Sequence, residues 1–521
     1  MLRSAFKVKL TKKVLALFLS LLLMITPVVA ISAAAATPVE KDIPMIDVHG
    51  FMAAHIYKDK DDPSKGYIWD WSQEEILDLI KKALPIIAKY FVMDDWDGMA
   101  NAVLPLVLEF FDGCILEPDG SPAGNTAVKF EYPDASTIKK DSVLDFSYDW
   151  RLDPLDSAAE LNKFIDYVLE CSGADQVALT CHSLGGVVTT SYISVYGDEK
   201  LRSVCYNTTA IYGETYTGEL LSGKMVLTGD AIQYYLEYAF EGMEYEKLLN
   251  GIISVANGLG LLDFVCNFGN LALEKLSPIL LPEVVVPLFA GMPSIWAMVP
   301  DEYVDASRDY VFNVVYKDSD VDRSALIEKL DNYDETVRAH KTETLRQLNE
   351  DANLYVFSRY GYSTIPIVPS YSRLTDSVVD TKYSSFGATT ADYKNKLSDE
   401  EIAGTDPAYI SPDRMIDAST CLFPEQTWFF KDFPHATNAP LEEMIETLLY
   451  TDFQATVDTY EEYPRFMQFN RETKTVSPYT AADAAGEVTF VQRLLNFLRI
   501  FTEKLQTLFE RIKTVVAAFR G

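Results

Sequence analysis

A serine followed by small residues ends an apolar run in this chain. Residues 177–181 are Val-Ala-Leu-Thr-Cys, and His182, Ser183, Leu184 and two glycines follow directly. A nucleophilic serine on a tight strand-to-helix turn needs small neighbours, because its hydroxyl must stand clear of the backbone. Cys181 occupies the position where the common G-x-S-x-G pattern has its first glycine. The pattern predicts that Ser183 attacks a carbonyl carbon and forms an acyl-enzyme.

A serine nucleophile needs a base that accepts its proton. The chain has five histidines, and in enzymes with this turn the base follows both the serine and the acid. His340 lies between Arg338 and Lys341 in a charged helical pattern, whereas His435 follows a strand pattern at residues 427–430. Sites on parallel sheets assemble at the carboxyl ends of strands. We therefore predict His435 as the general base.

An acid must orient the imidazole of that base. Asp376 comes after a strand pattern at residues 354–358 and a loop that contains glycine and proline. Asp380 is the alternative in the same stretch. We predict Asp376, because it directly precedes a small residue and a valine.

Two backbone amides must stabilise the oxyanion that forms on the attacked carbonyl. The amide of Leu184, directly after the serine, is one candidate. The second should come from the loop after an early strand, where Gly50 allows the backbone to turn inward. We predict Phe51 as the second donor, with Met52 as the alternative.

The sequence predicts no metal site and no cofactor. Residues 318–322 resemble the start of a calcium loop. Arg323 replaces the glycine that such a loop needs at its turn, and Lys329 replaces its bidentate glutamate. We therefore reject a calcium site there.

The elements that must position these residues follow an α/β pattern. Short apolar runs alternate with helical patterns up to about residue 210, which predicts a mostly parallel sheet flanked by helices. Residues 214–349 predict a largely helical cap inserted into this sheet. The expected fold is that of an α/β-hydrolase with its body at residues 37–471. Residues 74–111 carry apolar side chains at helical spacing, and residues 323–349 predict a charged helix.

Residues 1–36 predict a secretory signal peptide. Five basic residues precede an apolar run at residues 14–31 and an alanine-rich end, as export and cleavage require. A retained membrane anchor is the alternative, because 18 largely apolar residues could just span a bilayer. We therefore expect a secreted, extracellular protein.

The net charge excludes one class of partner, and the cysteines indicate no disulfide scaffold. The formal net charge is −32, and removal of the signal would leave about −37. So acidic a surface repels phosphate backbones, which excludes nucleic acid as a partner. The six cysteines are too scattered for a disulfide scaffold, and the sequence selects none of their 15 full pairings.

The C-terminal segment differs from the body. Residues 472–489 are rich in Thr, Ala, Ser and Gly and predict a linker. Residues 490–521 carry apolar side chains at helical spacing with basic side chains between them, which predicts a basic amphipathic helix. Such a helix suits contact with a membrane or cell surface. Self-association and docking on the acidic body are the open alternatives.

Several motifs together resemble the lecithin:cholesterol acyltransferase family of lipases, phospholipases and acyltransferases. Residues 148–151 read Tyr-Asp-Trp-Arg, the signature of this family, about 30 residues before the serine. The other similar segments, in chain order, are His49 to Phe51, residues 213–223, residues 293–300 with Trp296, residues 354–364, Asp376 to Val378, and His435. The resemblance covers roughly residues 43–450 and implies an α/β-hydrolase with a lipid-facing cap.

The resemblance and the residues together indicate hydrolysis of lipid acyl esters through a Ser-Asp-His triad. Transfer of the acyl group to an alcohol acceptor is the alternative, because the same triad serves both reactions. A noncatalytic surface-binding protein on this fold is the alternative of another class. Trp150, Arg151 and Trp296 are expected to support the site and the cap, since arginine has no proton to give at neutral pH.

Overall fold

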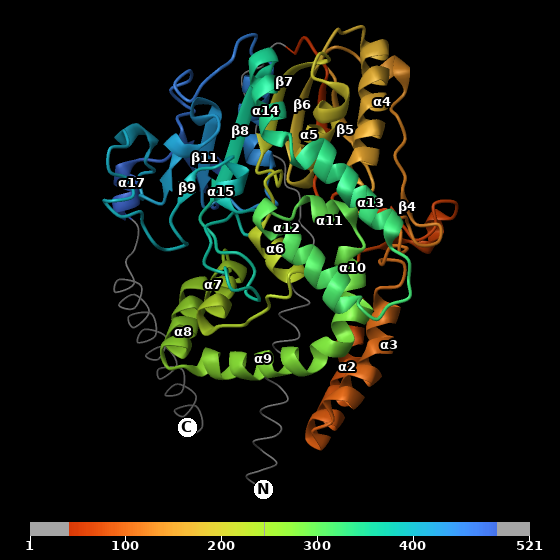
Figure 1. The fold of residues 1–521 in the computed structure, drawn as a ribbon. Coiled ribbons are helices and arrows are strands. Elements are labelled where there is room, and N and C mark those ends of the chain that lie inside the picture. The colour runs from red at the N-terminus through yellow and green to blue at the C-terminus, as the bar shows by residue number, and fades with distance from the viewer. Residues whose placement is uncertain (1–40, 244, 487–521) are drawn as a thin grey trace, which may run out of the picture.

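The computed structural model describes residues 41–243 and 245–486, and an eight-stranded sheet forms its centre (Figure 1). The strand order is β13-β12-β11-β8-β7-β6-β1-β5, and only β12 and β13 pair antiparallel. In chain order the strands are β1 (Met45–Val48), β5 (Val143–Phe146), β6 (Val177–His182), β7 (Leu201–Asn207), β8 (Asn353–Tyr360), β11 (Thr427–Lys431), β12 (Phe466–Asn470) and β13 (Thr475–Pro478). The predicted α/β fold with a mostly parallel sheet is confirmed.

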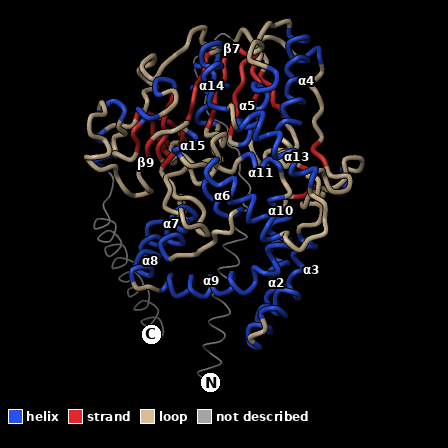
Figure 2. Tube along the Cα trace, in the orientation of Figure 1, coloured by secondary structure: helices blue, strands red, loops and turns tan. Residues whose placement is uncertain are grey.

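Helices cover both faces of this sheet, which is why its central strands are mainly apolar. On one face α4 (Pro154–Ser172), α5 (Leu184–Tyr196) and α14 (Lys341–Asp351) share a hydrophobic cluster with β1, β6 and β7. On the other face α16 (Glu442–Leu449) packs in a second cluster with β7, β8 and β11. Figure 2 shows the strands gathered behind α5 and α14.

A large helical insertion lies between β7 and β8, where the cap is expected. It contains α6 (Thr215–Leu221), α7 (Gly229–Ala239), α8 (Glu246–Gly258), α9 (Leu261–Leu280), α10 (Val286–Ala290), α11 (Pro293–Ala297), α12 (Val304–Arg308), α13 (Ser324–Tyr333) and α14. The helical pattern at residues 323–349 is not one helix, because the π-helical segment Asp334–Arg338 separates α13 from α14. Two further π-helical segments are Leu281–Val285 and Asp309–Val315.

The helical pattern at residues 74–111 forms two helices. They are α2 (Gln73–Met93) and α3 (Trp96–Phe110). Asp94 adopts a left-handed conformation that ends α2, and the Asp95 side chain then caps α3 by accepting from the amide of Gly98. This pair lies beside α9 (Figure 1), with the rings of Phe91 and Phe268 5.3 Å apart.

Small elements complete the fold. Two minor sheets join β2 (Ile56–Tyr57), β3 (Tyr67–Ile68) and β4 (Ala127–Val128), and β9 (Thr389–Thr390) with β10 (Ile416–Asp417). A short helix, α15, spans Thr381–Ser384. The 3₁₀ turns are Pro63–Lys65, Ala135–Thr137, Asp301–Tyr303, Pro407–Tyr409, Ala418–Thr420, Pro424–Gln426 and Ala439–Leu441.

The linker predicted at residues 472–489 is wrong over most of its length. Residues 475–478 form β13, which pairs with β12 from Met467↔Pro478 to Asn470↔Thr475, and α17 (Ala481–Gly486) follows. An edge strand pairs on one side only, so it tolerates the polar residues and the proline that suggested a linker. The sheet therefore extends past residue 471. The predicted signal peptide, residues 1–36, and the predicted helix, residues 490–521, lie outside the described residues.

In the described ranges no single helix is long and apolar enough to cross a membrane. Taken together, α8 and the following helical stretch Leu261–Ala290 meet that test of length and composition, but they are bent by 74°.

The start of α5 packs directly on the end of β1. A Cβ atom on Gly185 would lie 2.1 Å from the carbonyl oxygen of Val48, and one on Gly186 would lie 2.4 Å from the Cβ of Thr209. Real Cβ atoms do not approach other atoms so closely. The two glycines after the serine are therefore required by packing.

We predict that Gly185→Ala lowers the free energy of unfolding by about 1–3 kcal/mol, because the new methyl group must displace the backbone at Val48. Gly258→Ala is the matched control, since a Cβ there meets no atom within 4 Å. That change should be neutral or stabilising by up to about 1 kcal/mol, because alanine favours a helix over glycine. Urea unfolding of both variants measures the difference, and equal stabilities would contradict the prediction.

Candidate active site

Ser183 lies on a strained turn between β6 and α5. Its backbone has φ +55° and ψ −124°, and only 3% of the residue is exposed. A residue with a side chain adopts such a conformation at a cost of about 1–3 kcal/mol, and such residues cluster at functional sites. The surrounding strands and helices must therefore hold this turn in place.

The loop after β1 touches this turn through backbone atoms. A Cβ atom on Gly50 would lie 2.9 Å from the Cβ of Ser183 and 3.1 Å from the carbonyl oxygen of His182. Only glycine allows this approach. It brings the loop that carries Phe51 against the turn that carries Ser183.

The two predicted amide donors occupy suitable backbone positions. Leu184 is the first residue of α5, where a backbone N–H has no acceptor within the helix. Phe51 directly follows Gly50, and the alternative, Met52, has φ +60°. The ring of Phe51 packs edge-on against Trp150 with centroids 4.3 Å apart, which fixes this part of the loop.

The YDWR segment supports the site by holding the loop after β1. The Tyr148 hydroxyl donates to the carbonyl of His49 (2.8 Å), and the Trp150 indole donates to the carbonyl of Ala54 (3.0 Å). Arg151 is fully buried and forms two hydrogen bonds with the Asp149 carboxylate, at 2.9 and 2.7 Å. These contacts brace the backbone beside Ser183.

Trp296 lies within the cap. Its indole donates to the carbonyl of Ala290 at 2.8 Å and stacks on Phe312 with ring centroids 5.6 Å apart. The guanidinium of Arg338 donates to the carbonyl of Trp296 at 2.7 Å. Trp296 thus packs cap segments together.

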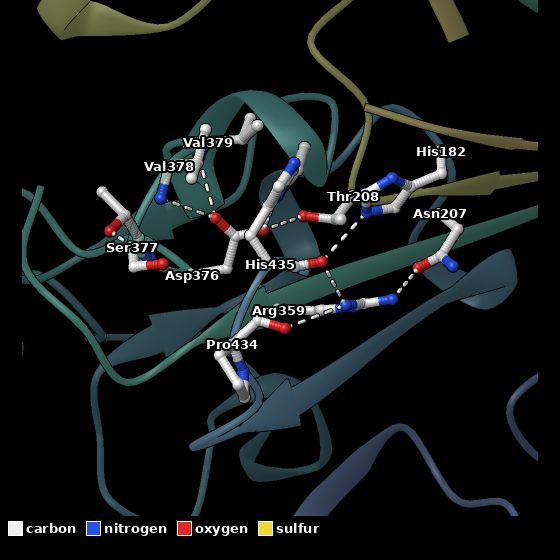
Figure 3. A network of polar contacts seen from close by, with 12 residues as sticks. His182, Asn207, Thr208, Arg359, Asp376, Ser377, Val378, Val379, Pro434 and His435 are labelled. Carbon is white, nitrogen blue, oxygen red and sulfur yellow. Dashed lines mark hydrogen bonds and ion pairs between the residues drawn. The ribbon is translucent and has the colours of Figure 1, made fainter. Parts of the chain in front are cut away.

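Asp376 and His435 lie side by side at the carboxyl ends of β8 and β11 (Figure 3). The Nδ1 atom of His435 is 2.7 Å from Oδ2 of Asp376, and the amide of His435 donates to the Asp376 carbonyl at 2.9 Å. The Asp376 carboxylate also accepts from the amides of Val378 (3.0 Å) and Val379 (2.8 Å) and from the Thr208 hydroxyl. The carboxylate is thus fully engaged and fixed.

The electrostatic surroundings keep Asp376 ionised. Complete burial alone would raise the pKa of this carboxyl, but the charge and hydrogen bond of His435, the Thr208 hydroxyl and the charge of Arg359 lower it below its usual value. The group therefore carries a negative charge toward the imidazole at neutral pH.

Asp380, the alternative acid, has another partner. Its carboxylate accepts from the amide (2.8 Å) and the hydroxyl (2.9 Å) of Thr215, at the start of α6. Burial raises the pKa of Asp380 to about 6, although the Thr215 hydrogen bonds act in the opposite direction. The structure places Asp376, and not Asp380, against His435.

Two side chains that the sequence analysis did not select hold the backbone of His435. The carbonyl oxygen of His435 is 3.0 Å from Nε2 of His182 and 2.8 Å from the guanidinium of Arg359 (Figure 3). For the contact from Arg359, the only signal in the sequence was an arginine near the end of the mainly apolar segment that forms β8. His340, the rejected base, is exposed at the start of α14.

Cys181 is buried where the strand approaches its turn. Its Sγ atom is 3.5 Å from the carbonyl oxygen of Cys205 on β7. Burial raises the pKa of this thiol well above its usual value, so the thiol stays protonated. Each of the six cysteines is a free thiol in the described structure.

Glu214 is a buried carboxyl near the Asp376–His435 pair. It lies between β7 and α6, only 2% exposed, and accepts from the Thr217 hydroxyl at 3.0 Å. Burial raises the pKa of Glu214 to about 7, although the hydrogen bonds of Tyr216 and Thr217 and the charge of His435 oppose this shift. The sequence analysis missed this residue because a glutamate gives no signal of burial.

One group of side chains among the described residues could in principle hold a metal ion. It consists of Asp47, His49 and Asp145, whose ligand atoms lie within 4.8 Å of one another. His49 is 3.7 Å from each carboxylate, and the Asp145 side chain is exposed. Partly exposed acidic groups of this kind are common without an ion, so this group does not revise the prediction.

Residues 133–246 match the family described as lecithin:cholesterol acyltransferase. The predicted resemblance to this family is confirmed. The match spans the YDWR segment, Ser183 and Glu214, and it ends before Asp376 and His435. No curated protein matches the chain. Among solved structures, one titled "The crystal structure of Tle4-Tli4 complex" aligns with 34% of this chain and 48% of that chain, at 15% identity and a TM-score of 0.19.

We predict that Glu214→Gln changes the pH dependence of stability. The folded protein holds the Glu214 proton up to a pKa of about 7, whereas the unfolded chain releases it near 4.5. The stability from this group is therefore fully present below about pH 4.5 and is lost as the pH rises through about 7. Glutamine stays neutral, so the variant should gain on the parent protein across this window, by on the order of 3 kcal/mol at most.

Urea unfolding of both proteins at pH 5 and pH 8 tests this prediction. The change in unfolding free energy between pH 5 and pH 8 is measured for each protein, and the two changes are subtracted. The contribution of the other acidic groups cancels, because both proteins contain them. Parallel pH dependences in the two proteins would contradict it.

Proposed function

We propose that this protein is a secreted serine hydrolase that cleaves acyl esters of lipids. The observation that carries the proposal is the hydrogen bond between Asp376 and His435, together with the hydrogen bond that His182, the residue before Ser183, donates to the backbone carbonyl of His435. A strained serine, a histidine and an ionised carboxylate are the parts that acyl-enzyme chemistry needs, and the contact of His182 with His435 supports bringing the three together.

In the proposed mechanism His435 accepts the proton of the Ser183 hydroxyl as the serine oxygen attacks the ester carbonyl carbon. Asp376 holds the imidazole through Nδ1 and stabilises its charged form. His435 then gives the proton to the departing alcohol, and Ser183 keeps the acyl group. Water attacks this ester in the second step, with His435 again accepting a proton, and Ser183 is regenerated.

The backbone amides of Leu184 and Phe51 would stabilise the negative charge on the carbonyl oxygen. Each donor of this kind contributes about 3 kcal/mol to the transition state. The tight approach of Gly50 to Ser183 supports this assignment, because it brings the Phe51 segment against the turn. Tyr148 and Trp150 supply the bracing that preorganised donors require.

The family match supports lipid acyl esters as the substrate class, and the surface of the cap agrees with it. The helices α8 and α9 meet at Gly260, which has φ +70°. Around this bend the side chains of Leu259, Leu261 and Phe264 are 71%, 54% and 57% exposed. We name these four residues the α8–α9 corner; α8 and α9 lie across the bottom of Figure 1. Covering apolar groups of this size with a lipid surface is energetically favourable, because it removes them from water.

Acyl transfer to an alcohol shares the first step with hydrolysis, so an assay must decide between them. We favour water as the acceptor because we expect the protein to be exported into an aqueous medium. Product analysis with a phospholipid substrate, with and without added alcohol, separates the two reactions. Free fatty acid indicates hydrolysis, and a new ester indicates transfer.

We predict that Ser183→Ala abolishes labelling by a fluorophosphonate probe and lowers kcat for ester hydrolysis by about 10⁶-fold. Asp376→Asn should lower kcat by about 10⁴-fold, because it stabilises the wrong tautomer of His435. Hydrolysis of a soluble p-nitrophenyl ester and of phospholipid vesicles gives the rates.

His340→Gln is the matched control, since it changes an exposed histidine at the start of α14. Its labelling and rates should equal those of the parent protein. Absence of labelling in the parent protein, or equal labelling of Ser183→Ala, would favour the noncatalytic binding protein. Activity restricted to short soluble esters would contradict the lipid substrate class.

We predict that Leu261→Asp with Phe264→Asp weakens binding to phosphatidylcholine vesicles at least about tenfold. The two side chains would otherwise lose contact with water on docking, and tenfold corresponds to about 1.4 kcal/mol. Co-flotation with vesicles measures binding, and thermal unfolding checks the fold. Val195→Asp with Val143→Asp is the control, because these valines are each 47% exposed on α5 and β5, outside the cap. Equal binding of both double variants would exclude the α8–α9 corner as a lipid contact.

A further inference from the structure

We propose that His182 and Arg359 are positioning residues that fix the general base relative to the nucleophile. They do so by donating hydrogen bonds to the same atom, the backbone carbonyl oxygen of His435. This inference rests on the proposed function, because it takes His435 as the base and Ser183 as the nucleophile.

The contact from His182 connects the serine turn directly to the base loop. A carbonyl oxygen only accepts hydrogen bonds, so Nε2 of His182 carries the proton and donates it. Burial, the nearby His435 ring and the charge of Arg359 lower the pKa of His182 well below its usual value. His182 is therefore a neutral donor at neutral pH. Its ring centroid lies 4.6 Å from that of His435.

Arg359 holds a longer stretch of the same loop. Its guanidinium donates to the carbonyls of Pro434 (3.0 Å), His435 (2.8 Å) and Thr437 (2.8 Å). It also donates to the side-chain carbonyls of Asn207 at the end of β7 (2.9 Å) and Asn438 (2.6 Å). Arg359 is fully buried, and none of these five acceptors is a carboxylate.

A buried cation is costly unless hydrogen bonds replace its lost hydration. Arg359 meets this requirement at its two terminal nitrogens, which donate to backbone carbonyls and to the side-chain amide oxygens of two asparagines, whereas its buried Nε atom has no hydrogen-bond partner among the described residues. The guanidinium also lies over the ring of Phe433, 4.5 Å from its centroid. A lysine would offer three donors from a single point and could not span the loop in the same way. The arrangement therefore requires the planar fork of arginine.

Together these contacts fix the position of His435 at three points. The His435 amide donates to the Asp376 carbonyl, the ring contacts the Asp376 carboxylate, and the carbonyl accepts from His182 and Arg359. Because His182 is covalently joined to Ser183, the third point fixes the base loop relative to the serine turn. A displacement of about 1 Å between reacting groups can lower a rate about 100-fold.

The test compares His182→Met and Arg359→Met with the conservative variants His182→Gln and Arg359→Lys. The methionine variants should lower kcat for a soluble p-nitrophenyl ester about 100-fold, with KM within about threefold, because the base moves while the substrate surface stays. Gln places an N–H near the position of the histidine Nε2, so His182→Gln should recover kcat to within about tenfold of the parent protein. Arg359→Lys should recover less, since it cannot reach all acceptors.

Arg465→Met is the matched control for loss of a buried arginine. Arg465 donates to the carbonyl of Pro424 and to the Glu425 carboxylate, away from the His435 loop. It should change the unfolding temperature and leave kcat per folded molecule unchanged. If Arg359→Met does not fold, the two His182 variants decide the question. Equal kcat for His182→Met and the parent protein would overturn the inference.

The two proposals fail in different ways. If Ser183→Ala keeps the activity of the parent protein, the proposed function fails and this inference fails with it. If Ser183→Ala is inactive but His182→Met keeps the parent kcat, only the positioning role is wrong. An equal fall in kcat for His182→Gln and His182→Met would also overturn it. Glutamine can donate the hydrogen bond and methionine cannot, so a role that depends on this bond requires the two variants to differ.

Discussion

Close backbone packing at the carboxyl ends of β1 and β6 is the constraint on which the rest of the site depends. Gly50 approaches the Cβ of Ser183, and Gly185 approaches the carbonyl of Val48, so neither position can carry a side chain. This packing keeps Ser183 in its strained conformation, whose cost the sheet and its covering helices offset. The loop after β1, the turn after β6 and the start of α5 therefore meet closely at two glycines. Only this close approach lets the loop that carries Phe51 lie against Ser183.

Around this contact two buried charged groups, Arg359 and Asp376, have mainly backbone and uncharged side-chain partners. Arg359 is held by carbonyls, and Asp376 accepts from the amides of Val378 and Val379 as well as from His435. Each such group fixes chain segments that are distant in sequence, because an unsatisfied buried charge costs several kcal/mol. Thr208, whose backbone φ is +46°, completes the set by donating to Asp376 from the end of β7. The hydrogen bonds of these polar groups thus fix the backbone positions of loops that apolar packing alone would hold less firmly.

The sequence predicted the parts of this structure that follow from periodicity and chain order. The parallel sheet and the adjacency of Asp376 and His435 followed from apolar runs and from the order of serine, acid and base. The contacts of His182 and Arg359 could not be predicted, because both side chains donate to a backbone carbonyl. Every residue type has such a carbonyl, so the sequence does not indicate which one is contacted. The strand β13 was missed for a related reason: an edge strand pairs through its backbone, so its side chains can resemble those of a linker.

Cys181 departs from the common G-x-S-x-G pattern at the residue two before Ser183, and the packing shows why the turn tolerates it. Its side chain points into the core, where it belongs to the same hydrophobic cluster as Val187 of α5 and Tyr206 of β7. The Sγ atom approaches the Cys205 carbonyl on the neighbouring strand, so its bulk lies between β6, β7 and α5. The tight approaches at this turn involve Gly50, Gly185 and Gly186, and not residue 181. Because burial also keeps the thiol protonated, Cys181 is itself a poor nucleophile.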